Sequence, residues 1–142
     1  VPAIKRFLGS IMTRVAPTFS MPTDIDPNCV SHDPMVVAAY ANDPLNGRVA
    51  SSRWFSETVA AHKGLEYAAR SLRCPTLIQQ SGADALADPQ ASRHLFTSVS
   101  APEKKYIEYP DLFHEIWFEQ DSEKVYADLT AWLQRNLIDG QA

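Results

Sequence analysis

The sequence of 142 residues predicts an α/β fold, with a helical region at 1–73 followed by the order strand, helix, strand, helix at 74–142. Two short strand-like runs, 76–80 and 104–109, stand on either side of one helical pattern. A strand, a crossover helix and a second strand form a right-handed parallel unit. Because two parallel strands alone leave edges and faces uncovered, we expect them to be part of a larger parallel sheet.

The opening residues 4–15 carry apolar side chains at helical spacing, with Lys5, Arg6 and Arg14 on other faces. Two interpretations stay open for this helix. It covers a neighbouring core, or it is a basic lid helix that makes peripheral contact with a membrane. Between residues 17 and 27, the prolines and turn residues predict a loop.

Two further helices are predicted before residue 74. Asp33 followed by Pro34 is typical of a helix N-terminus, and Asn42-Asp43-Pro44 ends that helix. A longer helix starts near Ser51 or Ser52. Its apolar stripe consists of Trp54, Ala61, Leu65, Ala68 and Leu72.

The two helices after residue 74 also have start and stop signals. Asp88-Pro89 predicts the start of the crossover helix, whose buried face comprises Leu95, Phe96 and Val99. The last helix starts at Asp121 or Ser122 and stops at Gly140. It places on one side Val125, Leu129, Trp132, Leu133 and Leu137.

Composition narrows the class of protein. With 13 Lys and Arg against 17 Asp and Glu, nucleic-acid binding has no electrostatic support. No apolar run approaches the roughly 20 residues needed to cross a bilayer, which predicts a cytoplasmic protein with at most peripheral membrane contact through residues 4–15. Cys29 and Cys74 lack metal-site spacing, so we expect free thiols and no metal or cofactor; a disulfide between them stays open.

Asp84 and His114 are the candidate catalytic residues. Each follows a predicted strand, where the groups that act on a ligand lie in an open α/β sheet. A carboxylate followed by an imidazole suggests the acid and base of a serine-hydrolase triad. The competing interpretations are a turn aspartate that accepts local hydrogen bonds and a solvated loop histidine.

The nucleophile of such a triad has no candidate in this sequence. The five glycines form no G-x-S-x-G turn, and Ser10 lies inside a helical pattern. The oxyanion-hole segment is also missing from these residues. Asp88 is a rival acid, but its place before Pro89 explains it as a helix cap. The other histidines do not follow a strand directly; they are His32, His62 and His94.

An ordered series of motifs resembles the monoacylglycerol lipase and lysophospholipase branch of the α/β-hydrolases, which are serine aminopeptidase-like. The motifs are SHDPMVVAAYANDPL at 31–45, Arg53-Trp54, and CPTLIQQSGAD at 74–84, then Asp88-Pro89, 104–109 and His114-Glu115. The resemblance implies a helical cap or lid at 1–73, over an acyl pocket, and the C-terminal part of the α/β-hydrolase core at 74–142. It also implies that Asp84 is the triad acid and His114 the base.

Two functions follow as hypotheses. The chain is the cap and acid/base half of a serine ester hydrolase that cleaves small lipid esters, and by itself it is inactive because it lacks the serine. Its partners would then be a lipid ester substrate and the missing N-terminal half, or a second copy of itself. Alternatively, it is a non-catalytic binding or interaction module derived from a hydrolase.

Overall fold

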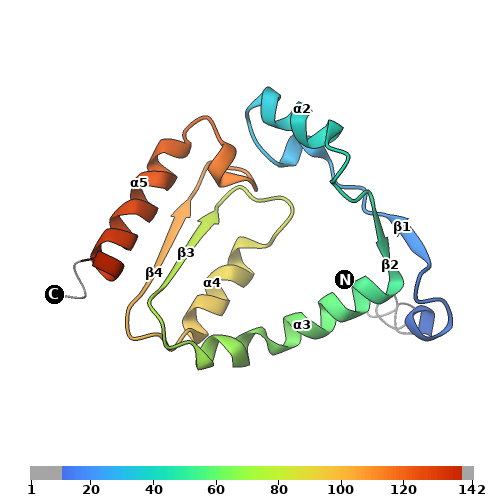
Figure 1. Cartoon of the computed structure of the whole chain (residues 1–142), viewed down its shortest axis with the longest axis horizontal. Helices are drawn as coiled ribbons and strands as arrows, with labels where there is room; N and C mark the ends of the chain where they lie inside the picture. The colour runs from blue at the N-terminus through green and yellow to red at the C-terminus, as the bar shows by residue number, and fades with distance from the viewer. Residues whose placement is uncertain (1–10, 139–142) are drawn as a thin grey trace. The chain divides into compact units, whose positions relative to one another are not determined.

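A computed structural model describes residues 11–138, and within them the chain forms two compact units (Figure 1). The first, here the hairpin unit, comprises the described residues up to Ile25 together with Pro44–Leu65. The second, here the sheet unit, comprises Asp26–Asp43 and the described residues from Glu66 onward. The candidate catalytic residues both belong to the sheet unit.

The sheet unit is built on two parallel strands, β3 (Thr76–Ser81) and β4 (Lys104–Tyr109). Thr76 lies opposite Lys104 and Ser81 opposite Tyr109, so the strands run in step and end together. Helix α4 (Pro89–Ser98) connects them, and the predicted order strand, helix, strand is confirmed. Among the described residues, each of these two strands pairs only with the other.

The helices α4 and α5 begin where the sequence predicts. The Asp88 carboxylate accepts a hydrogen bond from Gln90 N at 2.9 Å and caps α4. Helix α5 (Ser122–Leu133) follows Asp121 and continues as a π-helical turn, η3 (Gln134–Ile138). The predicted stop at Gly140 and the side chain of Leu137 lie outside the described residues.

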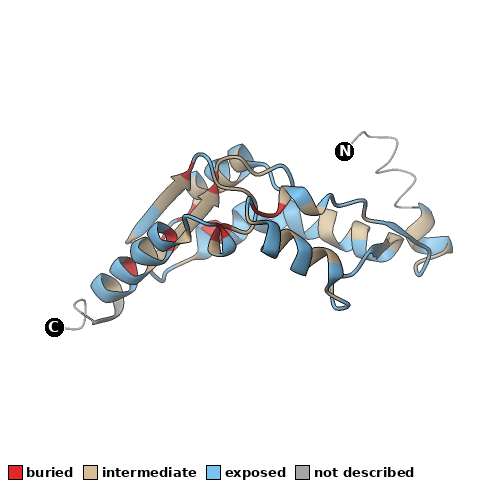
Figure 2. Ribbon diagram, turned by 90° about the horizontal axis from the view of Figure 1, so that it is seen from above, coloured by how far each residue is buried: buried red, intermediate tan, exposed pale blue. Residues whose placement is uncertain are grey.

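The buried side chains of the described chain all lie in the sheet unit (Figure 2). The predicted face of α4 packs inward: Val99 is buried, and Leu95 and Phe96 are partly buried against the cluster that contains it. On α5, Val125 and Trp132 are buried as predicted, but Leu133 is exposed. A second cluster joins β4 to α5 and to the short helix η2 (Ile116–Phe118); its buried members are Tyr109, Ile116 and Val125.

Strand β3 is more polar than a buried parallel strand usually is, and its Gln79 has a structural role. The Gln79 amide donates to the Tyr109 hydroxyl at 2.7 Å and to the Val125 carbonyl at 2.9 Å. The Tyr109 hydroxyl in turn donates to Asp128 at 3.0 Å. Burial raises the pKa of Tyr109 to about 12, which keeps this hydroxyl a donor. The polar side chain thus links both strands to α5.

The hairpin unit corrects the loop predicted for residues 17–27. Within it, β1 (Ser20–Pro22) pairs antiparallel with β2 (Val49–Ser51). Pro22 is tolerated because a proline can lie on an edge strand, where its missing N–H leaves no ladder bond unmade. Three residues are too few for an alternating pattern, so the sequence does not predict either strand. The short helix η1 (Pro27–Cys29) follows in the sheet unit.

The remaining helices agree with the predicted boundaries, and much of the apolar stripe identified at 54–72 is exposed, although Leu72 packs against the cluster that contains Val99. Helix α2 (Pro34–Asn42) begins after its cap Asp33, and α3 (Ser52–Ser71) begins at a predicted position. Trp54 is 58% exposed and Leu65 is 42% exposed; Ala69 is the one buried residue of α3. Helical spacing identifies residues that share a face, but it cannot say what covers that face.

The opening helix is described only from Ile11, and residues 11–15 are helical; the rest of the predicted segment 4–15 lies outside the described residues. In the part of the chain that the structure describes, no helix combines the length and apolar character needed to cross a membrane. Cys29 and Cys74 are both free, as predicted.

Candidate active site

The structure brings Asp84 and His114 together beyond the ends of β3 and β4. His114 Nδ1 lies 2.9 Å from Asp84 Oδ2. Because the last residues of the strands, Ser81 and Tyr109, lie opposite each other, the loops that follow start from the same edge. Parallel pairing of the strands therefore brings two residues that are thirty positions apart in the sequence within hydrogen-bonding distance.

Hydrogen bonds between the two loops fix this approach. Gly82 N donates to the Tyr109 carbonyl at 2.8 Å, and Ala83 N donates to the Leu112 carbonyl at 3.2 Å. The buried Ser81 hydroxyl also donates to the Leu112 carbonyl. Three successive residues, 81–83, consequently connect the turn that carries Asp84 to the loop that carries His114.

The Asp84 carboxylate makes contacts on both oxygens, and its side chain is 3% exposed. Oδ1 accepts from Leu86 N and Ala87 N at 2.8 Å each, while Oδ2 faces His114. Burial acts to raise the pKa of Asp84, but the hydrogen bonds from Ala87, His114 and Leu86 outweigh it and hold the pKa below its ordinary value. Asp84 is therefore both a turn residue and the partner of the histidine.

An ionised carboxylate only accepts hydrogen bonds, so Nδ1 of His114 must carry the proton that lies between the two groups. This assignment leaves Nε2 as the basic nitrogen of the ring. The His114 side chain is 39% exposed, so part of the ring is open to solvent. Chemically, the pair can take a proton at Nε2 while the carboxylate stabilises the resulting imidazolium.

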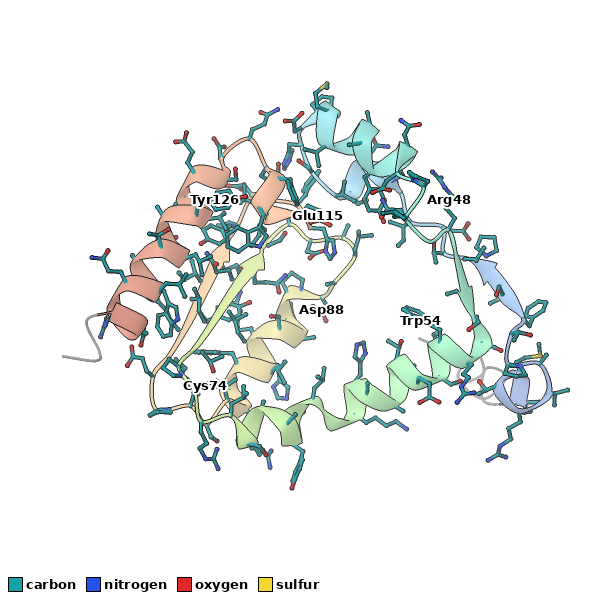
Figure 3. All side chains as sticks on the ribbon, viewed as in Figure 1. Arg48, Trp54, Cys74, Asp88, Glu115 and Tyr126 are labelled. Atoms are coloured by element: carbon teal, nitrogen blue, oxygen red, sulfur yellow. The ribbon has the colours of Figure 1, made fainter. Side chains whose placement is uncertain are left out.

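The histidine loop also rests on a segment that the sequence prediction did not include. His114 N donates to the Cys29 carbonyl at 3.5 Å, and Glu115 N donates to the Val30 carbonyl at 2.8 Å. Glu115 is labelled in Figure 3, on the loop after β4. Val30 is fully buried at this contact. Residues 29–32 thus belong to the surroundings of the site, although they precede the strands by more than forty positions.

Glu119 is a second residue that the sequence prediction missed. It is 4% exposed and accepts hydrogen bonds from the Ser31 hydroxyl, from His32 and from Phe113 N. The available signal was its position directly after the apolar run at 116–118, because an acidic residue that is buried beside apolar side chains must be paired. Sequence spacing alone could not name its partners.

The rival residues have other partners. Asp88 caps α4, and His94 Nε2 lies 3.4 Å from Glu66. His32 pairs with Glu119, and His62 is exposed on α3. Within the described range 11–138, no group of three or more potential ligands could hold a metal ion.

The sequence of this chain matches one protein family and several known proteins. The family model "Serine aminopeptidase, S33" matches residues 1–121. The chain is 27% identical to a monoacylglycerol lipase of Mycolicibacterium smegmatis over 132 residues, which are 92% of this chain and 46% of that protein. It is 28% identical to phospholipase YtpA of Bacillus subtilis over 113 residues, which are 79% of this chain and 44% of that protein.

A solved structure agrees with these relatives. The crystal structure of Paleococcus ferrophilus monoacylglycerol lipase superposes with a TM-score of 0.80 and 26% identity, covering 96% of this chain and 53% of that one. The chain thus spans about half the length of the proteins that it matches. Its parallel strands and helices are part of an α/β-hydrolase fold. The chain belongs to the serine aminopeptidase S33 family of hydrolases.

Proposed function

We propose that this chain is the cap and acid/base half of a serine ester hydrolase, with Asp84 as the acid and His114 as the base. The observation that carries the proposal is the 2.9 Å contact between them at the ends of two adjacent parallel strands. In the reaction, His114 Nε2 removes the proton of a serine hydroxyl and later returns a proton to the leaving alcohol. Asp84 keeps the ring in the required tautomer throughout.

The proposed substrates are small lipid esters such as monoacylglycerols and lysophospholipids. Relatives named as a monoacylglycerol lipase and as a phospholipase support this class. In the same proposal, residues 1–73 form the cap over the acyl chain and residues 74–142 form part of the core. The contacts of residues 29–32 with the histidine loop would place one segment of that cap beside the chemistry.

The serine and the oxyanion donors come, in this proposal, from a polypeptide segment outside these 142 residues, which contain no G-x-S-x-G. Acid and base without a nucleophile have nothing to activate. The isolated 142 residues should therefore hydrolyse a p-nitrophenyl ester no faster than buffer. Robust turnover by this chain alone would contradict the proposal.

The decisive experiment supplies the serine-bearing half, either fused or co-expressed, and adds a fluorophosphonate probe. We expect the probe to label the serine, and His114→Ala to abolish labelling because the base is lost. His62→Ala is the matched control, since His62 is exposed on α3 and should leave labelling unchanged. Full labelling of the His114→Ala protein would overturn the assignment. Ligand binding without any labelling would favour the non-catalytic module.

Unpaired strand edges support the need for a second polypeptide segment. In the described part of the chain, β3 and β4 each have one edge without a partner strand. Parallel strands are normally covered and flanked by others, so we expect the isolated chain to self-associate or to bind its other half. Sedimentation velocity at increasing protein concentration measures self-association of the isolated chain. A compact monomer at high concentration would count against the expected association.

A further inference from the structure

A buried carboxylate lies beneath the loop that carries His114. Glu119 Oε1 accepts from Phe113 N at 2.7 Å and contacts His32 Nδ1 at 2.9 Å. Glu119 Oε2 accepts from His32 N at 3.0 Å and from the Ser31 hydroxyl at 3.1 Å. The Glu119 side chain is 1% exposed, so these four contacts take the place of water.

These contacts favour the ionised form of Glu119. Burial acts to raise the pKa of this carboxyl, but the donors from Phe113, His32 and Ser31 outweigh it and hold the pKa below its ordinary value. A glutamine has the same shape but only one acceptor oxygen, and its amide would face donors. At least one of the donors would then be left unsatisfied in a buried place.

The contacts hold the backbone immediately before the catalytic histidine. Phe113 is bound to Glu119 through its backbone N–H, and its ring stacks on His32 at 3.7 Å between centroids. The next two backbone N–H groups, of His114 and Glu115, bind the carbonyls of residues 29 and 30. Three successive residues are therefore fixed to segment 29–32 and to Glu119, with His114 in the middle.

We propose that Glu119 is a positioning residue for His114: its ionised carboxylate joins segment 31–32 to Phe113 and so holds the imidazole at hydrogen-bonding distance from Asp84. The inference rests on the proposed function for its catalytic meaning. Its geometric part stands on this chain alone and can be tested without a serine. Glu119 itself touches neither Asp84 nor a reacting atom, and it acts through the histidine loop.

The first test is a spectroscopic measurement on this chain. The Nδ1 proton of His114 is followed by NMR in ¹⁵N-histidine-labelled protein, and Asp84→Asn identifies its resonance by removing the carboxylate acceptor. We expect Glu119→Gln to broaden or abolish that resonance. Two controls should retain it: Glu123→Gln, which removes an exposed acidic charge from α5, and Val125→Ala, which opens a cavity in the same core.

The Val125→Ala control separates positioning from stability, since it destabilises the core but removes none of the four polar contacts of Glu119. An unchanged His114 resonance in a folded Glu119→Gln protein would overturn the proposal. If that variant does not fold, Glu119→Asp decides the question, because the shorter side chain keeps the charge but draws the carboxylate away from Phe113 N and from the donors of residues 31–32. An unchanged resonance in Glu119→Asp would then overturn the proposal.

The second test uses the enzyme assembled with its serine-bearing half. Glu119→Gln should lower kcat by up to about 100-fold, the scale of a small misplacement of a catalytic group, with little change in KM. Loss of the NMR signal together with unchanged kcat would show that the proposed catalytic role of His114 fails while the positioning is correct. A retained signal would instead reject the positioning and leave the proposed function standing.

Discussion

Gly82 and Pro110 approach so closely that no side chain fits between them. A Cβ atom placed on Gly82 would lie 2.6 Å from Pro110 Cα and 2.9 Å from its carbonyl oxygen. Both residues directly follow the paired ends of β3 and β4, and they precede Asp84 and His114 by a few positions. The close backbone contact therefore sets the separation between the two loops of the candidate site.

Replacing Gly82 with alanine should push these loops apart, because the obstructing atoms belong to the backbone and cannot rotate away. We expect a loss of about 1–3 kcal/mol in the free energy of unfolding, measured by urea denaturation. Gly64→Ala is the matched control. Nothing lies within 4 Å of a Cβ at Gly64 in α3, so that change should stabilise by up to about 1 kcal/mol. Equal effects of the two substitutions would contradict this.

The two candidate acids should separate cleanly by mutation. In the assembled enzyme, Asp84→Asn should reduce the rate by about 10⁴-fold, because an amide no longer holds the histidine in the correct tautomer. Asp88→Ala should leave the rate unchanged and cost about 1 kcal/mol of stability through the lost helix cap. Ester hydrolysis and thermal unfolding of both variants test this. A large rate loss in Asp88→Ala would reverse the assignment.

Stability should fall in acid because two buried carboxylates have lowered pKa values, Asp84 and Glu119. Each lowered value contributes stability that is complete above the ordinary carboxyl range. That stability is lost as the pH falls through the lowered folded value. We expect the urea midpoint to decline below about pH 4.5. The Glu119→Gln protein should show a shallower decline, and an equal slope in both proteins would argue against the role of Glu119.

Removing the Tyr109 hydroxyl should weaken the junction between the sheet and α5. Tyr109→Phe leaves Asp128 without one donor and Gln79 without one acceptor, and we expect a loss of about 1–3 kcal/mol in unfolding free energy. Tyr126→Phe is the control, because this exposed tyrosine donates to a carbonyl where water can replace it. Urea denaturation of both variants measures this difference. An unchanged free energy of unfolding in Tyr109→Phe would show that the network contributes no net stability.

Much of the sheet unit could be predicted because its signals are local. Asp33 and Asp88 before prolines marked helix starts, and the run 104–109 marked a strand with its observed bounds. The three-residue strands β1 and β2 could not be predicted, since their pairing depends on a partner almost thirty residues away. The sequence also could not predict that Trp54 and Leu65 on α3 are exposed, because burial depends on what packs against a helix face.

For the candidate site, the residue types and their order can be read from the sequence alone: a carboxylate after one strand and an imidazole after the next. Local turn and strand preferences are encoded in neighbouring residues, so Asp84 and His114 could be identified. The folded structure was needed to show that these two side chains meet at 2.9 Å and that Glu119 and segment 29–32 hold the histidine loop. Asp84 and His114 are 30 positions apart, and segment 29–32 is more than 80 positions from the histidine loop and Glu119, so only the packed fold brings these residues within hydrogen-bonding distance.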